Sequence, residues 1–210
     1  MSEGTESTTS TWRGSSREQR DAERRDRLIQ AGLEIFGTTG YQTSTVTRLC
    51  SMASVSTRSF YELFSHRSDL LLAVYLHICD ELLQALRTLP PLPSDSLHRW
   101  LRDAVEVVLG PLLADLRKIR ILEIEMVGVS DDLEQSRRDT TRAITDALGD
   151  WQRAVSGAGD PLRRALLATF IEGGMSEALV AYARHELPSD VTADEFLDQV
   201  AALIESLLVP

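Results

Sequence analysis

The sequence predicts an all-α protein with two helical domains. Three observations support this fold class: apolar residues recur at helical spacing, no segment shows the alternation of a half-buried strand, and residues that start or end helices separate the periodic segments. These breaks divide the chain into a disordered N-terminal arm over residues 1–20, a three-helix helix-turn-helix domain over residues 21–66, and a larger helical domain over residues 67–210.

The first two helices are recognised by their apolar faces. The core stripe of the first helix consists of Leu28, Ala31, Leu33, Ile35 and Phe36. Gly40 then permits the left-handed conformation that commonly ends a helix. Thr45 is of a residue type that caps helix N-termini, so we expect the second helix to begin there. Its buried face consists of Val46, Leu49, Cys50 and Ala53.

A tight turn over residues 54–56 leads into a short third helix over residues 57–64. In a helix-turn-helix, one helix crosses the DNA backbone while the next enters the major groove, so the turn must be short and fixed by a buried apolar residue. Val55 has that position. Phe60 and Phe64, four residues apart, hold the third helix to the core. The residues left on its outer face, within reach of bases or phosphates, are Thr57, Arg58, Ser59 and Tyr61.

This segment resembles the DNA-binding domain of the TetR family of transcriptional regulators over residues 20–72. The resemblance is carried by Gly40, Tyr41, Thr45, Val46, Val55, Ser56, Phe60, Tyr61, Phe64 and Leu70. The chain departs from the family pattern at Leu49-Cys50, where Ile-Ala is common, and at Arg67, where lysine is usual. It also departs at Ser54, which replaces a glycine that tolerates a positive φ.

The resemblance implies a homodimer that binds palindromic double-stranded DNA and responds to a small molecule bound in the C-terminal domain. In this mechanism the ligand moves the helix over residues 67–87 and spoils the spacing of the two third helices, which relieves repression. We therefore expect a transcriptional repressor; the alternative is the reverse direction, since some members of the family activate transcription or respond to corepressors. The residues expected to contact DNA are Thr45, Thr47, Arg48, Ser56, Thr57, Arg58, Ser59, Tyr61 and Arg67.

Two alternatives to DNA binding remain open for this segment. Many all-α domains contain a three-helix element that only packs, and a protein-interaction module could keep the same fold without binding DNA. Glu62, on the outer face of the third helix, either accepts a hydrogen bond from a cytosine or faces solvent. The hydroxyls, Arg58 and Tyr61 on that face favour DNA binding, because a merely solvated face is typically richer in acidic residues.

The composition of residues 1–20 predicts disorder, because Ser, Thr, Gly and charged residues dominate and Trp12 is almost the only large apolar side chain. Five arginines lie in or just after this arm, at Arg13, Arg17, Arg20, Arg24 and Arg25. Acidic residues interrupt them, at Glu18, Asp21, Glu23 and Asp26. The arm either enters a minor groove, as homeodomain arms do, or stays solvated.

The net charge of −10 is unevenly distributed along the chain. Residues 1–70 contain nine arginines and nine acidic residues, so all of the net negative charge lies in residues 71–210. A local positive face can still bind phosphates while the acidic second domain repels DNA. We therefore expect affinity to depend strongly on the DNA site.

The C-terminal domain is predicted to contain helices only. A connector helix spans residues 67–87 and is followed by the PPLP segment at 90–93, and the next helix runs from Asp95 to Leu109 before Gly110-Pro111. A segment over residues 111–127 follows. Further helices span Asp131 to about Val155, Pro161 to about His185, and a last helix that begins with a capping box at residues 192–195 and ends near Leu208.

The last helix has two adjacent apolar stripes, at residues 196, 200, 203 and 207 and at residues 197, 201, 204 and 208. One stripe suffices for packing against the core of its own domain, so the second stripe indicates a partner helix, for which a second copy of the chain is the economical choice. The alternative is a terminal helix buried wholly in its own domain. The family resemblance implies a four-helix interface from the last two helices of each subunit. Gly173 and Gly174, in the preceding helix, fit a close helix contact, a kink or room for a ligand. The interface candidates are Gly174, Leu179, Phe196, Val200, Leu203 and Leu207.

A ligand pocket in the second domain is implied by the resemblance. Its candidate wall residues also fit an ordinary core, because an apolar stripe at helical spacing needs no ligand. A mostly apolar effector, cationic or neutral, suits such a lining. The candidates are Trp100, Leu101, Val105, Leu122, Met126, Trp151, Phe170 and Met175.

Several classes of protein are disfavoured by the sequence. It contains no apolar run of membrane-spanning length and no signal peptide, so we expect a cytoplasmic protein. Cys50 and Cys79 lie on apolar helical faces and are expected to be core thiols. The four histidines show no metal-ligand spacing, and no phosphate loop or nucleophile elbow indicates an enzyme. We expect no metal and no cofactor.

Overall fold

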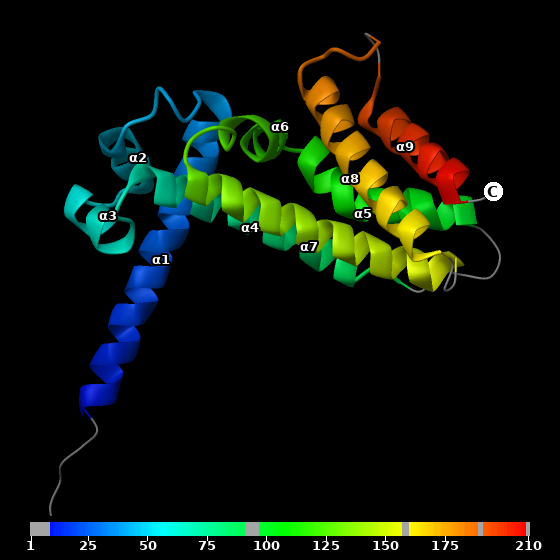
Figure 1. The fold of residues 1–210 in the computed structure, drawn as a ribbon. Helices are drawn as coiled ribbons and strands as arrows, with labels where there is room; N and C mark the ends of the chain where they lie inside the picture. The colour runs from blue at the N-terminus through cyan, green and yellow to red at the C-terminus, as the bar shows by residue number, and fades with distance from the viewer. Residues whose placement is uncertain (1–8, 91–96, 157–159, 189–190, 209–210) are drawn as a thin grey trace, which may run out of the picture. The chain divides into compact units, whose positions relative to one another are not determined.

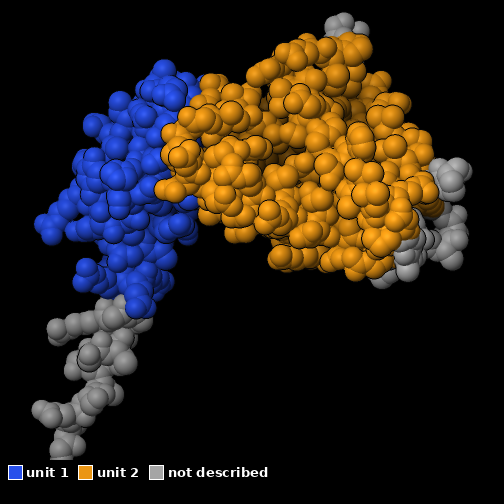
Figure 2. Space-filling model, viewed as in Figure 1, with its two compact units in different colours: residues 1–74 blue, residues 75–210 orange. Residues whose placement is uncertain are grey.

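The structure is a computed structural model that describes residues 9–90, 97–156, 160–188 and 191–208. Throughout these ranges every regular element is a helix, so the predicted all-α fold class is confirmed. The chain forms two compact units, residues 1–74 and residues 75–210 (Figure 2). The division falls inside a helix that begins at Arg67, later than the predicted boundary after residue 66, because the first two turns of that helix pack in the N-terminal unit.

The N-terminal unit is a three-helix domain completed by the start of a fourth helix (Figure 1). Its helices are α1 (Thr9–Thr38), α2 (Val46–Ala53), α3 (Thr57–Leu63) and the first part of α4 (Arg67–Arg87). Helix α1 packs against both α2 and α3. The core contains completely buried side chains at Leu28, Ile35, Phe36, Leu49, Phe60 and Leu70.

Gly32 allows α1 and α4 to approach closely. A Cβ atom at this position would lie 2.7 Å from Cγ2 of Val74 and 3.2 Å from the Phe36 ring. Such a contact is shorter than carbon atoms tolerate, so only glycine fits without a shift of the helices.

Helix α1 is longer than the sequence predicted. It begins at Thr9, inside the segment 1–20 that we expected to be a disordered arm. Residues 17–27 are mostly Arg, Glu and Gln, which are good helix formers, and Arg24 forms an i,i+3 ion pair with Asp21. Local propensity and this ion pair therefore favour extension of the helix toward its N-terminus. Residues 1–8 and the Trp12 side chain lie outside the described part of the chain.

The turn between α2 and α3 is built on Ser54. This residue has φ 52° and ψ 44°, the left-handed conformation in which glycine is usual. Its N–H donates to the carbonyl of Ser51 (3.3 Å), and the N–H of Val55 donates to the carbonyl of Cys50 (3.0 Å). Val55 is buried, as the helix-turn-helix pattern predicted.

We expect Ser54→Gly to raise the free energy of unfolding by about 0.5–1 kcal/mol, because it removes the steric cost of a left-handed L-residue. The matched control is Ser51→Gly, which places glycine inside α2 and is expected to lower the free energy of unfolding by about 1 kcal/mol. Urea denaturation followed by circular dichroism measures both. Equal destabilisation by the two variants would contradict this explanation of the turn.

The second unit contains the rest of α4 and five further helices, one of which continues into a π-helical turn. They are α5 (Leu97–Leu113), α6 (Leu116–Arg120) with η1 (Ile121–Glu125), α7 (Asp131–Ser156), α8 (Pro161–Ala183) and α9 (Ala193–Leu208). Helix α5 packs against α9, and α7 packs against α8. The predicted capping box is present, since the Thr192 N–H donates to the Glu195 carboxylate (2.9 Å) and the Glu195 N–H donates to Thr192 Oγ1 (3.2 Å).

Helix α5 corrects one predicted boundary. Gly110-Pro111 was expected to end it, but the helix continues to Leu113. Pro111 removes one hydrogen bond, to the carbonyl of Val107, which lies on the exposed side of the helix. Burial of Leu112 in the next position offsets that loss. The predicted start at Asp95 and the break at residues 157–159 lie outside the described residues.

Candidate nucleic-acid interface and internal cavity

Helix α3 presents a polar face opposite a buried one. Phe60 is completely buried, whereas the Arg58 side chain is 90% exposed and Tyr61 is 57% exposed. Ser56 caps the helix and accepts a hydrogen bond from the Ser59 N–H (3.1 Å). Helix α3 of the N-terminal unit (Figure 1) therefore presents a guanidinium and a phenol to solvent.

Helix α2 adds hydroxyls and a second guanidinium. Thr45 caps α2 by accepting from the Arg48 N–H (3.2 Å), and Thr47 and Arg48 are exposed. The structure thus places the nine predicted DNA-contacting residues in one unit. All are exposed except Ser59 and Arg67, which are half-buried.

Arg67 has a different environment from the one we expected. Its guanidinium donates a hydrogen bond to the carbonyl of Ser44 and lies 4.2 Å from the centroid of the Tyr41 ring. These contacts fix the loop before α2 to the start of α4. In the free protein Arg67 therefore has a structural role, and its guanidinium does not extend into solvent toward a DNA phosphate.

Glu62 contacts Arg58 across the outer face of α3. Arg58 Nε donates to Glu62 Oε1 at 3.1 Å, and both side chains are more than half exposed. An exposed pair of this kind contributes little to stability and exchanges readily for another partner. Arg58 can therefore leave Glu62 for a phosphate or a guanine.

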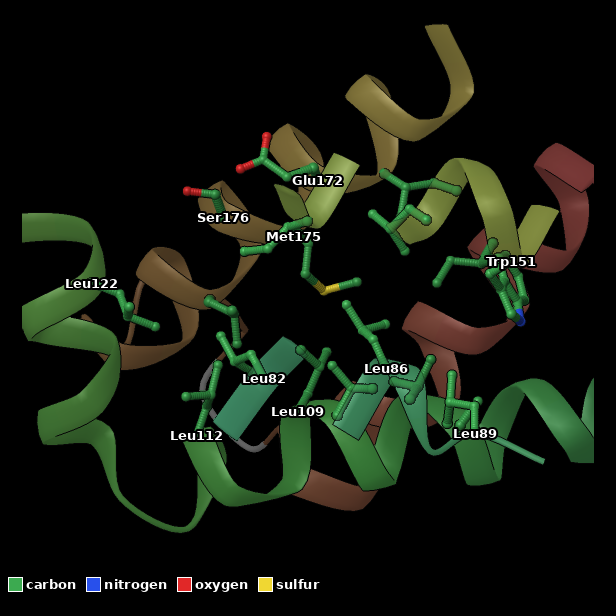
Figure 3. A pocket seen from close by; sticks show the side chains of 18 of the residues that line it. Leu82, Leu86, Leu89, Leu109, Leu112, Leu122, Trp151, Glu172, Met175 and Ser176 are labelled. Carbon is green, nitrogen blue, oxygen red and sulfur yellow. The ribbon is translucent and has the colours of Figure 1, made fainter. Parts of the chain in front are cut away.

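The second unit contains a partly open cavity of about 140 Å³, between the end of α4 and helices α5, α7, α8 and α9, with η1 at one side (Figure 3). Met175 on α8 extends its thioether into the space. Of the eight predicted wall residues, the cavity is lined by Leu101, Val105, Leu122, Trp151 and Met175.

Three predicted wall residues lie elsewhere. Trp100 is buried beside the cavity, where it stacks on Trp151 with ring centroids 5.4 Å apart and donates from Nε1 to the carbonyl of Pro90 (3.1 Å). Met126 is completely buried in the core. Phe170 is 70% exposed, because it lies on the side of α8 that faces away from the unit.

Other residues that line the cavity were not predicted, and those on α4, η1 and α8 are the most informative. Helix α4 was interpreted only as a connector, yet Leu82 and Leu86, at four-residue spacing, line the cavity together with Leu89. Leucines four residues apart lie on one face of a helix, so this spacing was a sign in the sequence that α4 has an apolar face there. Glu123 and Ser176 were also missed; a carboxylate between two apolar neighbours, as Glu123 is in sequence, was the available sign of a half-buried acid.

The polar groups of the cavity gather at one side, where Glu172 and Ser176 project from α8 (Figure 3). The Ser176 hydroxyl donates to Glu123 Oε2 at 2.5 Å. Burial raises the pKa of Glu123 above its ordinary value, despite the Ser176 hydrogen bond and the charge of Arg137. Burial also raises the pKa of Glu172, and the negative charge of Glu123 adds to that shift.

A second candidate surface lies on α8 and α9. Exposed large apolar side chains project from α8 at Leu162 (66%), Leu166 (50%) and Phe170 (70%), and from α9 at Leu203 (63%) and Leu207 (43%). Gly174 is also exposed, and a Cβ atom at Gly173 or Gly174 would meet nothing within 4 Å. Scattered apolar residues are normal on a surface, but five on two helices indicate a contact site.

Half of the predicted interface residues do not reach this surface. Leu179, Phe196 and Val200 are buried in their own unit, because the first apolar stripe of α9 packs inward at its start. The Phe196 ring contacts Tyr182 of α8 at 5.0 Å between centroids. Leu203 and Leu207, farther along the same stripe, are exposed.

Cys50 and Cys79 are free and buried, as predicted. Burial raises the pKa of the Cys79 thiol to about 12, so this sulfur is unreactive. In the described ranges no cluster of three or more His, Cys, Asp or Glu could hold a metal ion. Nor does any helix there have both the length and the apolar character needed to cross a bilayer.

These features define a class of protein: an all-α chain with a helix-turn-helix unit and a second helical unit that contains an apolar cavity. No protein-family model matches the chain. The HTH-type transcriptional activator FasR of Mycolicibacterium smegmatis is 29% identical over 173 residues, which are 82% of this chain and 76% of that protein.

Two solved structures have a fold similar to that of this chain. A TetR-family transcriptional regulator from Streptomyces coelicolor matches with a TM-score of 0.72 at 16% identity, over 89% of this chain and 80% of that one. FadR from Bacillus subtilis, solved with stearoyl-CoA, matches with a TM-score of 0.65 at 15% identity, over 87% and 96% of the two chains. The chain has the TetR-family fold, so the resemblance found over residues 20–72 is confirmed.

Proposed function

We propose that this protein is a transcriptional regulator, and not an enzyme, that binds a palindromic operator as a homodimer and releases it when a small molecule enters the cavity. The observation that carries the proposal is the face of α3, where Arg58 and Tyr61 are exposed on a helix anchored by the buried Phe60. A guanidinium and a phenol are suited to base edges and phosphates in the major groove. The M. smegmatis relative, named a transcriptional activator, supports a regulatory role.

Dimerisation is supported by the exposed apolar side chains of α8 and α9. A helix-turn-helix generally binds two half-sites related by two-fold symmetry, and a two-fold interface uses the same patch on both subunits. Leu203 and Leu207 of the predicted set belong to this patch, and Leu162, Leu166 and Phe170 join them. Gly173 and Gly174 leave room for a partner helix to approach.

Effector control is supported by the continuity of α4. The helix begins in the N-terminal unit at Arg67, and farther along it Leu82 and Leu86 line the cavity. A ligand that displaces these two leucines acts on the same helix that carries Leu70 and Val74 into the core of the DNA-binding unit. B. subtilis FadR, which shares the fold, binds stearoyl-CoA.

The test is binding of the purified protein to the DNA immediately upstream of its own gene. We expect a footprint over two related half-sites, no comparable footprint on a scrambled duplex, and affinity that falls steeply with salt because phosphate contacts release counterions. A reporter under this promoter gives the sign of regulation: repression predicts higher expression when the gene is deleted. If neither this DNA nor selection from random duplexes yields a preferred site, the protein-interaction module replaces the proposal.

A further inference from the structure

The cavity of the second unit is apolar except at one side. Leucine, valine, isoleucine, alanine, methionine and tryptophan side chains form nearly all of its wall. The polar exceptions are Glu123 on η1 and Glu172 and Ser176 on α8. Figure 3 shows Glu172 and Ser176 on the same side, away from Trp151 and Leu89. An occupant therefore meets carboxyl groups at one end and hydrocarbon at the other.

Among the residues that the structure describes, neither carboxyl group has a cationic partner. The nearest candidate is Arg137 on α7, and it is engaged by Glu134, to which Nε donates at 3.1 Å and a second guanidinium nitrogen at 3.0 Å. Glu123 receives one hydrogen bond, from the Ser176 hydroxyl. Among the described residues, no Lys, Arg or His lies within ion-pair distance of Glu123 or Glu172.

Two half-buried carboxyl groups without a counter-ion are costly for the fold when ionised. The raised pKa values of both groups express this cost, since burial disfavours their charged forms and Glu123 disfavours the charge of Glu172. A positive charge beside them would remove the cost, whereas a carboxylate or phosphate would increase it.

We propose that the cavity binds an apolar molecule carrying a cationic nitrogen, with the nitrogen beside Glu123 and Glu172 and the hydrocarbon among Leu86, Trp151 and Met175. This inference rests on the proposed function, in which the cavity is the effector site. It goes further by assigning the charge of the effector. It also separates this chain from FadR of B. subtilis, whose ligand, stearoyl-CoA, carries phosphates.

Three probes with one tail and different head groups test the proposal: hexylamine, hexan-1-ol and hexanoate. The volume of about 140 Å³ suits a short tail, since an apolar cavity of about 150 Å³ holds benzene. Tryptophan fluorescence reports binding, because Trp151 lines the cavity and stacks on Trp100. We expect hexylamine to bind about tenfold more tightly than hexan-1-ol, and hexanoate more weakly than both.

Variants of the two glutamates test whether they contact the cationic nitrogen of the bound amine. Glu123→Gln and Glu172→Gln are each expected to lower hexylamine affinity about tenfold and to leave hexan-1-ol affinity within about twofold. Asp103→Asn is the matched control, because Asp103 is exposed on α5, does not line the cavity and does not act on either carboxyl group. It should leave all three affinities unchanged. Melting temperatures verify that each variant folds.

Equal binding of amine and alcohol, or tighter binding of hexanoate or stearoyl-CoA, would overturn the cationic effector while leaving the effector site intact. Absence of binding by every probe would overturn both this inference and the effector role of the cavity. DNA binding by the protein is measured separately, so neither result affects the operator test.

Discussion

Phe170→Glu is expected to convert the protein from a dimer to a monomer and to lower its operator affinity by about 100-fold or more, because two linked DNA-binding units gain that factor from avidity. Phe170 is 70% exposed in the single chain, between the exposed Leu166 and the open surface at Gly173 and Gly174. If a partner helix covers this surface, a carboxylate there is buried without a counter-ion. Sedimentation velocity gives the mass, and a gel-shift titration gives the affinity.

Val107→Glu is the matched control for this prediction. Val107 is 50% exposed on α5, outside the two helices that carry the exposed apolar patch, so the same apolar-to-acidic change should leave the dimer and its operator affinity unaltered. A Phe170→Glu variant that remains dimeric would show that the exposed face of α8 is not the subunit interface.

Local chemistry explains why the sequence predicted the helix-turn-helix closely. Thr45, Ser56 and the capping box at residues 192–195 act on backbone groups within three residues, so their effect can be predicted without knowing the tertiary fold. The turn at Ser54 is also closed by local hydrogen bonds, from the Ser54 N–H to the Ser51 carbonyl and from the Val55 N–H to the Cys50 carbonyl. The end of α5 was missed because burial of Leu112, a tertiary effect, outweighs the helix-breaking tendency of Pro111.

Candidate site residues were predicted less well. Helical spacing shows which residues share a face of a helix, but it does not show which other helix or cavity that face contacts. Phe170 and Met175 lie on the same helix, and periodicity alone did not show that only Met175 turns toward the cavity. Likewise, the stripe of α9 is continuous in sequence, yet Phe196 is buried while Leu203 is exposed. Which end of a stripe is covered depends on the helices packed beside it, here α5 and α8.

Alanine at both Arg58 and Tyr61 is expected to lower operator affinity by about 100-fold while leaving the dimer and the melting temperature unchanged, because each side chain is exposed and supplies contacts of the kind that discriminate bases. Arg58→Ala alone should also lower the slope of log affinity against log salt by about one if the guanidinium contacts a phosphate. Arg142→Ala, an exposed arginine on α7, is the control and should change neither quantity.

The Glu62→Gln variant distinguishes the two roles considered for Glu62, which is either a solvent-exposed acid or an acceptor of a hydrogen bond from a cytosine. In the free protein Glu62 holds Arg58 Nε at 3.1 Å and places a negative charge on a face that must approach phosphates. If Glu62 only faces solvent, the substitution frees Arg58 and raises affinity for operator and scrambled DNA alike. If Glu62 accepts a hydrogen bond from a cytosine, affinity for the operator falls while affinity for scrambled DNA rises, because only the specific complex loses a contact. In that case Glu62 contributes to the sequence specificity of operator binding.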